Sequence, residues 1–397
     1  MTLESTSPTA LEQPCDTCTR RRKPTIGLPR CEDSAERRFP LTPEGVAQLT
    51  ERGFLIKMQE NAASTIHYDD AKYVRAGVEI VPRSEALACD IVIYPATLSA
   101  PDARCMRRGA MLLTLLRGAC ADERTLRVLL DRHVIAIALD LIEDERGCTP
   151  FADILAEIDG RASIAIASSL LADSQRGKGI LLGGVAGIVP CETLIIGSGI
   201  AACAAARSAM GLGATVRMFD NDVYSLRRAS QELGPWVITS SLHPRTLANA
   251  LRSADVLVVT PTSTPFTLHA DAVATMKRGV LTFDLTTDAD GSTFPSMTPV
   301  DLALASAVDA SLQIDNRICY VHAGSAVART AGMALTNTLL TLLDSIISSG
   351  EGASNVLKLH PGMQKATLTF FGKPIHQRIA SMLHTRNVDI SIFLTLS

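Results

Sequence analysis

A glycine-rich turn after an apolar segment is the part of this sequence most directly tied to chemistry. It reads G-x-G-x-x-A, and its residues are Gly197, Ser198, Gly199, Ile200, Ala201 and Ala202. In such a turn the first glycine permits a tight bend, the second lets backbone amides approach a diphosphate, and the alanine lets helix and strand pack closely. The start of the following helix adds N–H donors and a positive dipole end. The pattern therefore predicts a dinucleotide site.

An acidic residue at the end of the next predicted strand strengthens this prediction. Asp220 follows residues 215–219, in the place where a carboxylate accepts hydrogen bonds from the ribose hydroxyls of the adenosine half. This favours NAD over NADP as the cofactor. Strand alternation turns Arg217 away from Asp220, so Arg217 gives little support for binding a 2′-phosphate. The alternative is a glycine turn that binds no ligand.

The surrounding elements are those of an α/β protein, because apolar strand-length segments alternate with helical segments from Thr25 onward. Two sets of strands are expected, at 25–29, 54–58, 78–80, 91–94, 111–115 and 134–138, and then at 193–196, 215–219, 236–239, 256–260, 280–284 and 318–321. The second set has the order of a Rossmann fold. Long helices are expected over 149–172 and 328–349, and helices alone after residue 350.

Composition limits the classes of function. With 397 residues and 47% apolar side chains, the chain is long enough for two domains. A formal net charge of -3 provides no field that would attract nucleic acid or an anionic membrane. Because no apolar run is long enough to span a membrane and no signal segment opens the chain, we expect a cytoplasmic protein with small-molecule partners.

The first 24 residues are expected to form a disordered, solvated leader. They contain Cys15 and Cys18 at C-x-x-C spacing, followed by a basic run. A zinc site would need a second pair of ligands nearby, and the sequence offers none. We therefore predict no metal site.

Two motifs near residue 30 and several later ones follow one family pattern. Residues 27–30 read G-x-P-[KR] and residues 36–43 read E-x-R-x-x-x-T-P, with further matches at 179–187, 211–214, 284–291, 328–330, 334–337 and 372–373. With these motifs the sequence resembles the alanine dehydrogenase and transhydrogenase alpha-subunit family. The resemblance implies two Rossmann-like domains, one of them discontinuous, and a homo-oligomer. We expect a substrate domain over 25–150, an inserted NAD(P)-binding domain over 151–327, and a linker helix with the return to the substrate domain over 328–397.

The resemblance also implies a substrate site with altered residues. Arg38 matches the family arginine that holds the substrate carboxylate, a task suited to its forked guanidinium; the alternative is a surface ion pair with Glu36. The family's catalytic lysine and histidine correspond to Ala96 and Arg117. Neither residue type can take a proton, which hydride transfer from an amino or hydroxy acid requires. Arg117 beside Arg38 would suit a substrate with two acidic groups, or with a carboxylate and a phosphate.

Two further residues are candidates for the lost proton transfer. His322 aligns with a family asparagine in the nicotinamide pocket and can titrate near neutrality; the alternative is a packed or solvated histidine. Asp288 matches the family's aspartate facing the substrate and would bind an ammonium group or hold His322, although loop aspartates after strands are also common turn formers.

These residues favour an NAD(P)-dependent oxidoreductase of the alanine dehydrogenase type, acting on a small-molecule carboxylate substrate that is an amino or keto acid other than alanine. One alternative is a dinucleotide-binding pseudoenzyme that serves as a sensor. Another is a lyase or cyclodeaminase that uses bound NAD internally. The nicotinamide-reading residues of the transhydrogenase branch are not found within 148–161, so no membrane partner is predicted.

Overall fold

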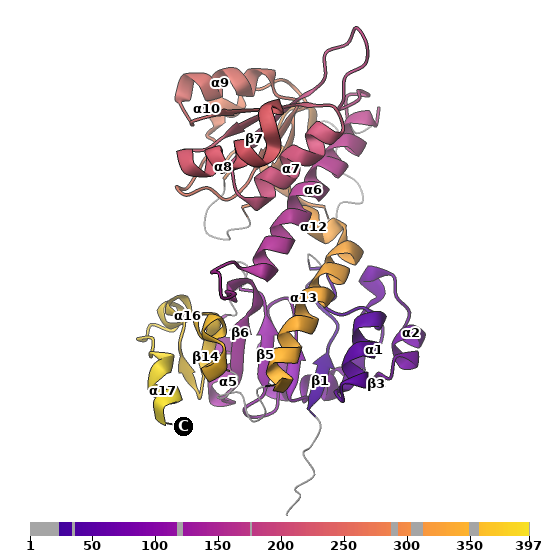
Figure 1. Ribbon diagram of the computed structural model, residues 1–397, viewed down its shortest axis with the longest axis vertical. Helices are drawn as coiled ribbons and strands as arrows, with labels where there is room; N and C mark the ends of the chain where they lie inside the picture. Colours follow the sequence, from indigo (N-terminus) through magenta and orange to yellow (C-terminus); the bar gives the residue numbers. More distant parts are fainter. Residues whose placement is uncertain are drawn as a thin grey trace, which may run out of the picture.

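Two β-sheets covered by helices lie at opposite ends of an elongated molecule (Figure 1). The computed structural model describes residues 24–33, 36–116, 122–174, 177–286, 293–302, 313–348 and 357–396. Cys15, Cys18, Arg117 and Asp288 lie outside the described residues, as does the expected leader apart from Pro24.

The first sheet has eight strands in the order β15-β14-β6-β5-β4-β1-β2-β3. Its six parallel strands are β1 (Thr25–Leu28), β2 (Leu55–Gln59), β3 (Glu79–Val81), β4 (Ile91–Ile93), β5 (Met111–Thr114) and β6 (Ile135–Ala138). The helices between them are α1 (Pro43–Glu51), η1 (Ser64–Ile66), α2 (Asp70–Arg75), α3 (Arg83–Leu87), α4 (Ala100–Cys105), α5 (Glu123–Asp131) and η2 (Leu139–Leu141). The central strands are apolar and buried because helices cover both faces of a parallel sheet.

The C-terminal segment returns to this sheet and adds two strands that the sequence did not predict. β14 (Thr367–Phe370) runs antiparallel to β6, and β15 (Lys373–Pro374) pairs with β14. The turn between them consists of Phe371 and Gly372, whose φ angles of 45° and 75° are both positive, as a two-residue hairpin requires. The helices of this segment are α15 (Pro361–Lys365), α16 (Gln377–Met382) and α17 (Ile390–Leu396).

The second sheet has seven parallel strands in the order β12-β13-β11-β10-β7-β8-β9. They are β7 (Glu192–Ile196), β8 (Thr215–Phe219), β9 (Val237–Ser240), β10 (Val256–Val259), β11 (Leu281–Asp284), β12 (Thr298–Asp301) and β13 (Ile318–Val321). The helices here are α7 (Ile200–Gly211), α8 (Val223–Leu233), η3 (Gly234–Trp236), α9 (Pro244–Ser253), α10 (Ala270–Val273) and α12 (Ala323–Ala326). Strand β12 was not predicted. The prediction of two Rossmann-like domains, the first built from both parts of the chain, is confirmed.

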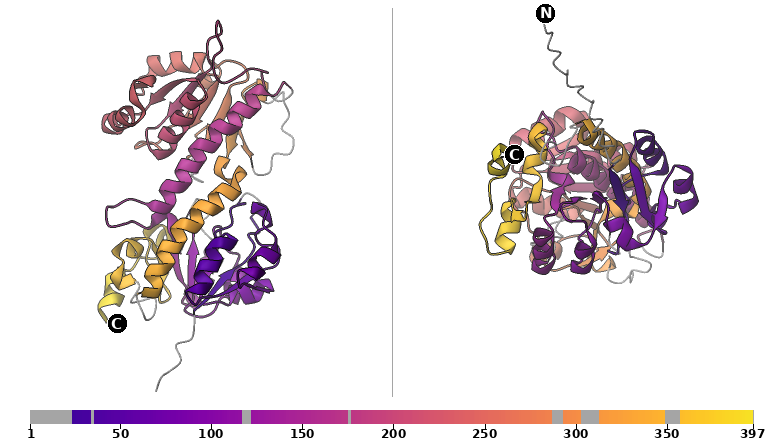
Figure 2. Two further views of the ribbon diagram at one scale, coloured as in Figure 1. Left: turned by 45° about the vertical axis from the view of Figure 1, so that its right-hand side comes forward. Right: turned by 90° about the horizontal axis from the view of Figure 1, so that it is seen from below.

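Two long helices connect the domains. α6 (Pro150–Ala172) runs from the first sheet to the second, and α13 (Ala328–Ser348) runs back beside it (Figures 1 and 2). Both agree with the predicted helices to within one residue. Within the described part of the chain, no helix has the length and apolar character needed to cross a membrane.

A buried threonine fastens α13 to the first domain. The Oγ1 atom of Thr336 accepts a hydrogen bond from the amide of Thr42 at 2.9 Å and donates one to the carbonyl of Gly332 at 2.7 Å. Thr42 is the residue that caps α1, with its own hydroxyl accepting from the amide of Gly45 at 3.4 Å. The start of α1 and the middle of α13 are therefore held by one hydroxyl group.

Replacing Thr336 by Val is expected to lower the free energy of unfolding of the first domain by about 1–3 kcal/mol, because the buried amide of Thr42 loses its acceptor. Urea unfolding measures the change. The matched control is Thr338→Val, since among the described residues the Thr338 hydroxyl donates to Ala334 of its own helix and to no other element. Equal losses in the two variants would contradict this account.

Candidate functional site

The glycine turn lies between β7 and α7 and shows why its first glycine is needed. Gly197 has a φ of 100°, and a Cβ atom there would lie 2.1 Å from Oγ1 of Thr260. Thr260 cannot move away easily, because its hydroxyl and its amide both donate to the carbonyl of Ile196 at 2.9 Å. The turn therefore packs closely against Thr260 at the end of β10.

The second glycine of the turn borders open space. No described atom lies within 4 Å of the position that a Cβ of Gly199 would take. Helix α7 begins directly after it, and the amides of a first helical turn have no partner within the helix. Ile200 is exposed at this end, whereas Ala201 and Ala202 are buried against the sheet. The arrangement leaves room for an anionic group to reach the backbone amides.

The carboxylate of Asp220 lies beside the same turn. Its Oδ2 atom accepts a hydrogen bond from the hydroxyl of Ser198 at 2.6 Å, and its Oδ1 atom accepts one from the amide of Asp222 at 3.1 Å. The side chain is buried in this structure, with 3% of its surface exposed. Arg217 is directed elsewhere, because its Nε atom lies 2.8 Å from Oε1 of Glu192. The structure thus brings the predicted cofactor residues together.

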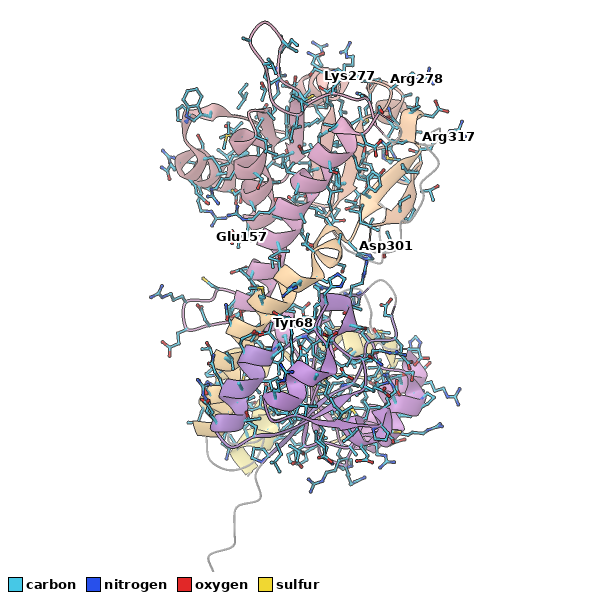
Figure 3. The ribbon with its side chains drawn as sticks, turned by 90° about the vertical axis from the view of Figure 1, so that its right-hand side faces the viewer. Tyr68, Glu157, Lys277, Arg278, Asp301 and Arg317 are labelled. Carbon is cyan, nitrogen blue, oxygen red and sulfur yellow. The ribbon has the colours of Figure 1, made fainter. Side chains whose placement is uncertain are left out.

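His322 follows the last residue of β13 and is held by an aspartate. Its Nδ1 atom lies 2.9 Å from Oδ2 of Asp301, the last residue of β12. The strand register explains the contact, since Asp301 is paired with Val321, the residue before His322. The imidazole keeps 36% of its surface exposed. Figure 3 shows Asp301 at the end of the second domain that faces the first. Sequence reasoning missed Asp301 because β12 was not predicted.

Asp159 of α6 interacts both with the start of α12, next to His322, and with the first domain. Its Oδ1 atom accepts a hydrogen bond from the amide of Gly324 at 2.8 Å, and a Cβ on Gly324 would lie only 2.2 Å from that oxygen. The same carboxylate acts electrostatically on Arg38. His322, which precedes α12, is therefore connected through Gly324 and Asp159 to the first-domain arginine.

Arg38 is buried and paired with Glu36. Its Nε atom donates to Oε1 of Glu36 at 2.6 Å, and its Nη2 atom donates to Oε2. Burial acts to lower the pKa of Arg38, but the charge of Glu36 and its hydrogen bonds raise it overall, with smaller contributions from Asp159 and Asp140. The ion pair considered from the sequence is therefore present, although at 2% exposure it is buried rather than on the surface. Whether Arg38 also holds a substrate carboxylate stays a prediction.

Comparison with known proteins assigns the whole fold. The family model described as "Alanine dehydrogenase/PNT, N-terminal domain" matches residues 27–158, and "Alanine dehydrogenase/PNT, C-terminal domain" matches residues 163–377. The chain belongs to the alanine dehydrogenase/PNT family. An alanine dehydrogenase of Mycolicibacterium smegmatis is 29% identical over 377 residues, covering 93% of this chain and 99% of the relative. One of Methanococcus maripaludis is 28% identical over 365 residues, covering 89% and 95%.

Solved structures agree with this assignment. An L-alanine dehydrogenase matches with a TM-score of 0.78 at 25% identity, covering 91% of this chain and 99% of the other. A transhydrogenase from Sinorhizobium meliloti matches with a TM-score of 0.70 at 18% identity, covering 89% and 99%, and shows the shared fold.

In this member of the alanine dehydrogenase/PNT family, Ala96 lies in apolar surroundings. It is buried and lines a small pocket in which the described side chains carry no charge. The pocket's described lining residues are Ala96, Thr97, Leu98, Leu112, Thr114, Leu115, Leu116, Thr125, Leu126, Leu129, Ala136, Leu368, Thr369 and Ile379. The position assigned to the family lysine therefore lies in the uncharged lining of this pocket.

The described residues form no group of three or more side chains that could hold a metal ion.

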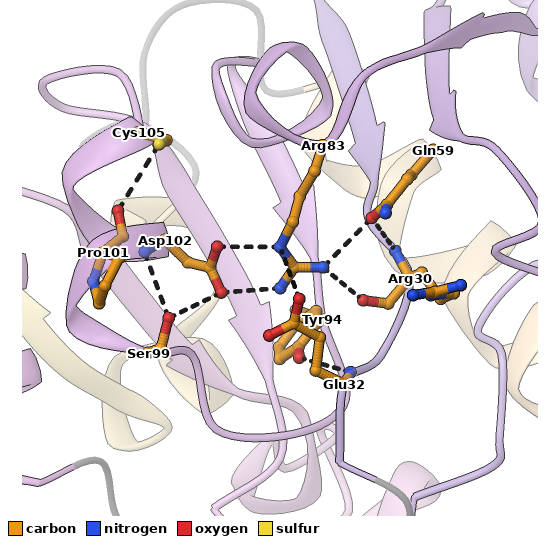
Figure 4. Close-up of polar contacts among 9 residues, drawn as sticks. All are labelled: Arg30, Glu32, Gln59, Arg83, Tyr94, Ser99, Pro101, Asp102 and Cys105. Atoms are coloured by element: carbon orange, nitrogen blue, oxygen red, sulfur yellow. Dashed lines mark hydrogen bonds and ion pairs between the residues drawn. The ribbon is translucent and has the colours of Figure 1, made fainter.

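Arg83 is a structural residue of this site that sequence reasoning missed (Figure 4). Its Nε and Nη2 atoms donate to the two carboxylate oxygens of Asp102 at 2.9 and 2.7 Å. Its Nη1 atom donates to the carbonyl of Arg30 at 2.6 Å and to Oε1 of Gln59 at 3.2 Å. Arg83 thereby holds together the segment after β1, the end of β2 and the start of α4. No sequence motif links these distant partners.

Tyr94 lies beside this arginine at the end of β4. Its hydroxyl accepts a hydrogen bond from the amide of Glu32 at 3.2 Å, and its ring centre is 5.8 Å from the guanidinium carbon of Arg83. Burial raises the pKa of Tyr94 to about 12, so the hydroxyl stays protonated at neutral pH. The loop that leads to Glu36 and Arg38 is therefore anchored at both Arg30 and Glu32.

Replacing Asp102 by Asn is expected to lower the free energy of unfolding by about 1–3 kcal/mol at neutral pH, because Arg83 loses the carboxylate that accepts two of its hydrogen bonds and, among the described carboxylates, keeps only the longer contact with Glu32. Hydrogen bonds from Arg83, followed by those from Ser99, hold the pKa of Asp102 below its ordinary value. The carboxylate therefore stabilises the fold above its unfolded pKa of about 3.9, and this stabilisation is lost as the pH falls through the folded pKa.

Urea unfolding over a series of pH values measures the difference between wild type and Asp102→Asn, which should shrink toward zero in acid. The control is Glu123→Gln, which breaks an exposed pair with Arg127 and should leave stability close to that of wild type, because solvent screens exposed pairs. A difference between wild type and Asp102→Asn that does not vary with pH would argue against this role for the ion pair.

Proposed function

We propose that this protein is an NAD-dependent oxidoreductase of the alanine dehydrogenase type that acts on an amino or keto acid other than alanine. The observation that carries the proposal is the pair of His322 and Asp301, with Nδ1 and Oδ2 2.9 Å apart, at the end of the second domain that faces the first. Among the described residues, Nε2 of this histidine has no partner. An oriented imidazole with one free nitrogen can accept a proton. It could therefore take over the proton transfer for which the family lysine and histidine are missing.

The residues around the glycine turn fit a dinucleotide. The open space at Gly199 and the amides at the start of α7 suit a diphosphate. Asp220, fixed by Ser198, suits the ribose hydroxyls and supports NAD rather than NADP. When bound, the nicotinamide would supply the acceptor for the hydride that leaves the substrate carbon.

His322 would accept the proton that the substrate's amino or hydroxyl group releases. With Asp301 beside Nδ1, that nitrogen carries a proton and Nε2 is the free acceptor. The carboxylate then stabilises the imidazolium that forms, and the reverse reaction returns the proton. Asp288 remains a proposed second group facing the substrate's ammonium. Arg38 and Arg117 remain the proposed carboxylate-binding residues.

A dinucleotide-binding protein without turnover is the second candidate. It is favoured by the buried pair of Arg38 and Glu36, because a guanidinium engaged in this way has fewer donors left for a substrate. The two candidates differ in one observable, the reduction of NAD in the presence of an acid.

We also propose that the protein is cytoplasmic and that it forms a homo-oligomer, the second of which the family resemblance implies. The segment between α6 and β7 projects from the second domain (Figure 2) and leaves Leu181, Ile188 and Val189 exposed, at 65%, 68% and 87%. Contact with a second copy would remove this apolar surface from water.

The proposed function is tested by incubating the protein with NAD and a panel of amino and hydroxy acids, while the absorbance of reduced nicotinamide is followed. We expect turnover with at least one acid, and a loss of about 100-fold or more in kcat for His322→Gln, because general base catalysis contributes at least that factor.

The matched control for His322→Gln is His133→Gln. Both histidines have a φ of 55°, so the backbone demand is the same, but His133 contacts Arg108 in the first domain. NADH binding should be unchanged in both variants. No turnover with any acid, together with normal NADH binding, would favour the second candidate.

Replacing Gly199 by Val is expected to weaken NADH binding by about tenfold or more while leaving the fold intact, since the new side chain fills the space reserved for the diphosphate. Fluorescence titration with NADH measures the affinity, and circular dichroism the fold. The control is Gly211→Val at the other end of α7, where a side chain also meets open space. Unaltered affinity of the Gly199 variant would place the cofactor elsewhere.

A further inference from the structure

Two positively charged side chains flank one tyrosine near the junction of the domains. The guanidinium carbon of Arg329 lies 4.6 Å from the ring centre of Tyr68, and Nζ of Lys72 lies 5.2 Å from it. Both charged residues are exposed, and among the described residues neither has an acidic partner. Arg38 and Arg83 of the same domain are, by contrast, each paired with a carboxylate. This cation pair is left with its charge uncompensated.

The position of Arg329 in its helix adds to this imbalance. It is the second residue of α13, where the helix dipole is positive and a cation is disfavoured. A free energy cost of this kind is offset when an anion binds. The aromatic ring contributes as well, because it attracts both cations and holds them in place without neutralising them.

Tyr68 is a rigid support for these two cations. Only 9% of its surface is exposed, and its ring packs edge-on against Tyr73 with centres 6.4 Å apart. Tyr73 is itself fixed, because its hydroxyl donates to the carbonyl of Leu41 at 2.7 Å. A ligand binding here would therefore meet groups that are already ordered, which lowers the entropy that binding costs.

The contacts of α13 place this cation pair beside the candidate active site. A Cβ on Gly332, one helical turn after Arg329, would lie 2.8 Å from the carbonyl of Phe39 and 3.6 Å from Ile66. Phe39 follows Arg38, and Ile66 shortly precedes Tyr68. Figure 3 shows Tyr68 at the end of the first domain that faces the second, across from Asp301. The cation pair therefore lies near the segment that carries Arg38, at the end of the first domain that faces Asp301.

We propose that Arg329 and Lys72 bind a second anionic group of the substrate, so that the preferred substrate is an acid with two negative groups. This inference rests on the proposed function and narrows its substrate class. Arg329 presents a planar fork suited to a carboxylate or a phosphate, and Lys72 adds a point charge. A monoacid such as alanine leaves this pair without a partner.

The test uses redox-inactive probes, so that it does not depend on turnover. Acetate, succinate and phosphonoacetate are each added to the full-length protein with NADH present, and binding is followed by thermal shift and calorimetry. Wild type should bind succinate or phosphonoacetate about tenfold or more tightly than acetate. Arg329→Met and Lys72→Met should each reduce this preference, and Arg329→Lys should retain part of it.

The matched control is Arg317→Met, which removes an exposed arginine of the second domain at a site that Figure 3 shows far from Tyr68. It should keep the wild-type preference. Equal binding of mono- and dianions by wild type, or an unchanged preference in Arg329→Met, would overturn the proposal. Selective dianion binding that Arg329→Met abolishes, in a protein that reduces no NAD, would support the proposal and refute the proposed function.

Discussion

A hydrogen bond from the amide of Gly324 to Asp159 links the second domain to the long helix that enters it from the first. It joins the start of α12 in the second domain to the middle of α6, and its geometry leaves no room for a side chain at residue 324. Asp159 is buried, with 7% of its surface exposed, so loss of its carboxylate would leave the buried amide of Gly324 without this acceptor. This contact lies two residues after His322, and the charge of the same carboxylate acts on Arg38.

Most of the fold could be predicted because parallel strands that are covered on both faces are continuous apolar runs. β10 and β13 illustrate this, since the predicted and observed strands differ by at most one residue. The three strands that were missed lie at or near the sheet edges and lack such a run. β12 contains Pro299 and has exposed residues at its start, as edge strands tolerate. β14 alternates threonine with apolar residues, so it contains no continuous apolar run.

The candidate site could be predicted only where a local motif carries the chemistry. The turn from Gly197 to Ala202 and its acid, Asp220, are adjacent in sequence to the elements that position them. By contrast, the partner of His322 is supplied by a strand with no recognisable pattern, and Arg83 reaches Arg30 and Asp102 across the chain. A sequence also cannot show whether the two neighbours Glu36 and Arg38 point apart or, as here, toward each other.

The pairing of β14 with β6 has a consequence for biosynthesis. The hydroxyl of Thr369 donates to the carbonyl of Val134, a residue 235 positions earlier, so the first sheet is incomplete until the segment around Thr369 has left the ribosome. The second domain is continuous in sequence, so it can fold before β14 and β15, the last strands of the first domain, have been synthesised. The N-terminal half must therefore remain soluble with the outer edge of β6 unpaired, and only the arrival of the C-terminal hairpin covers that edge.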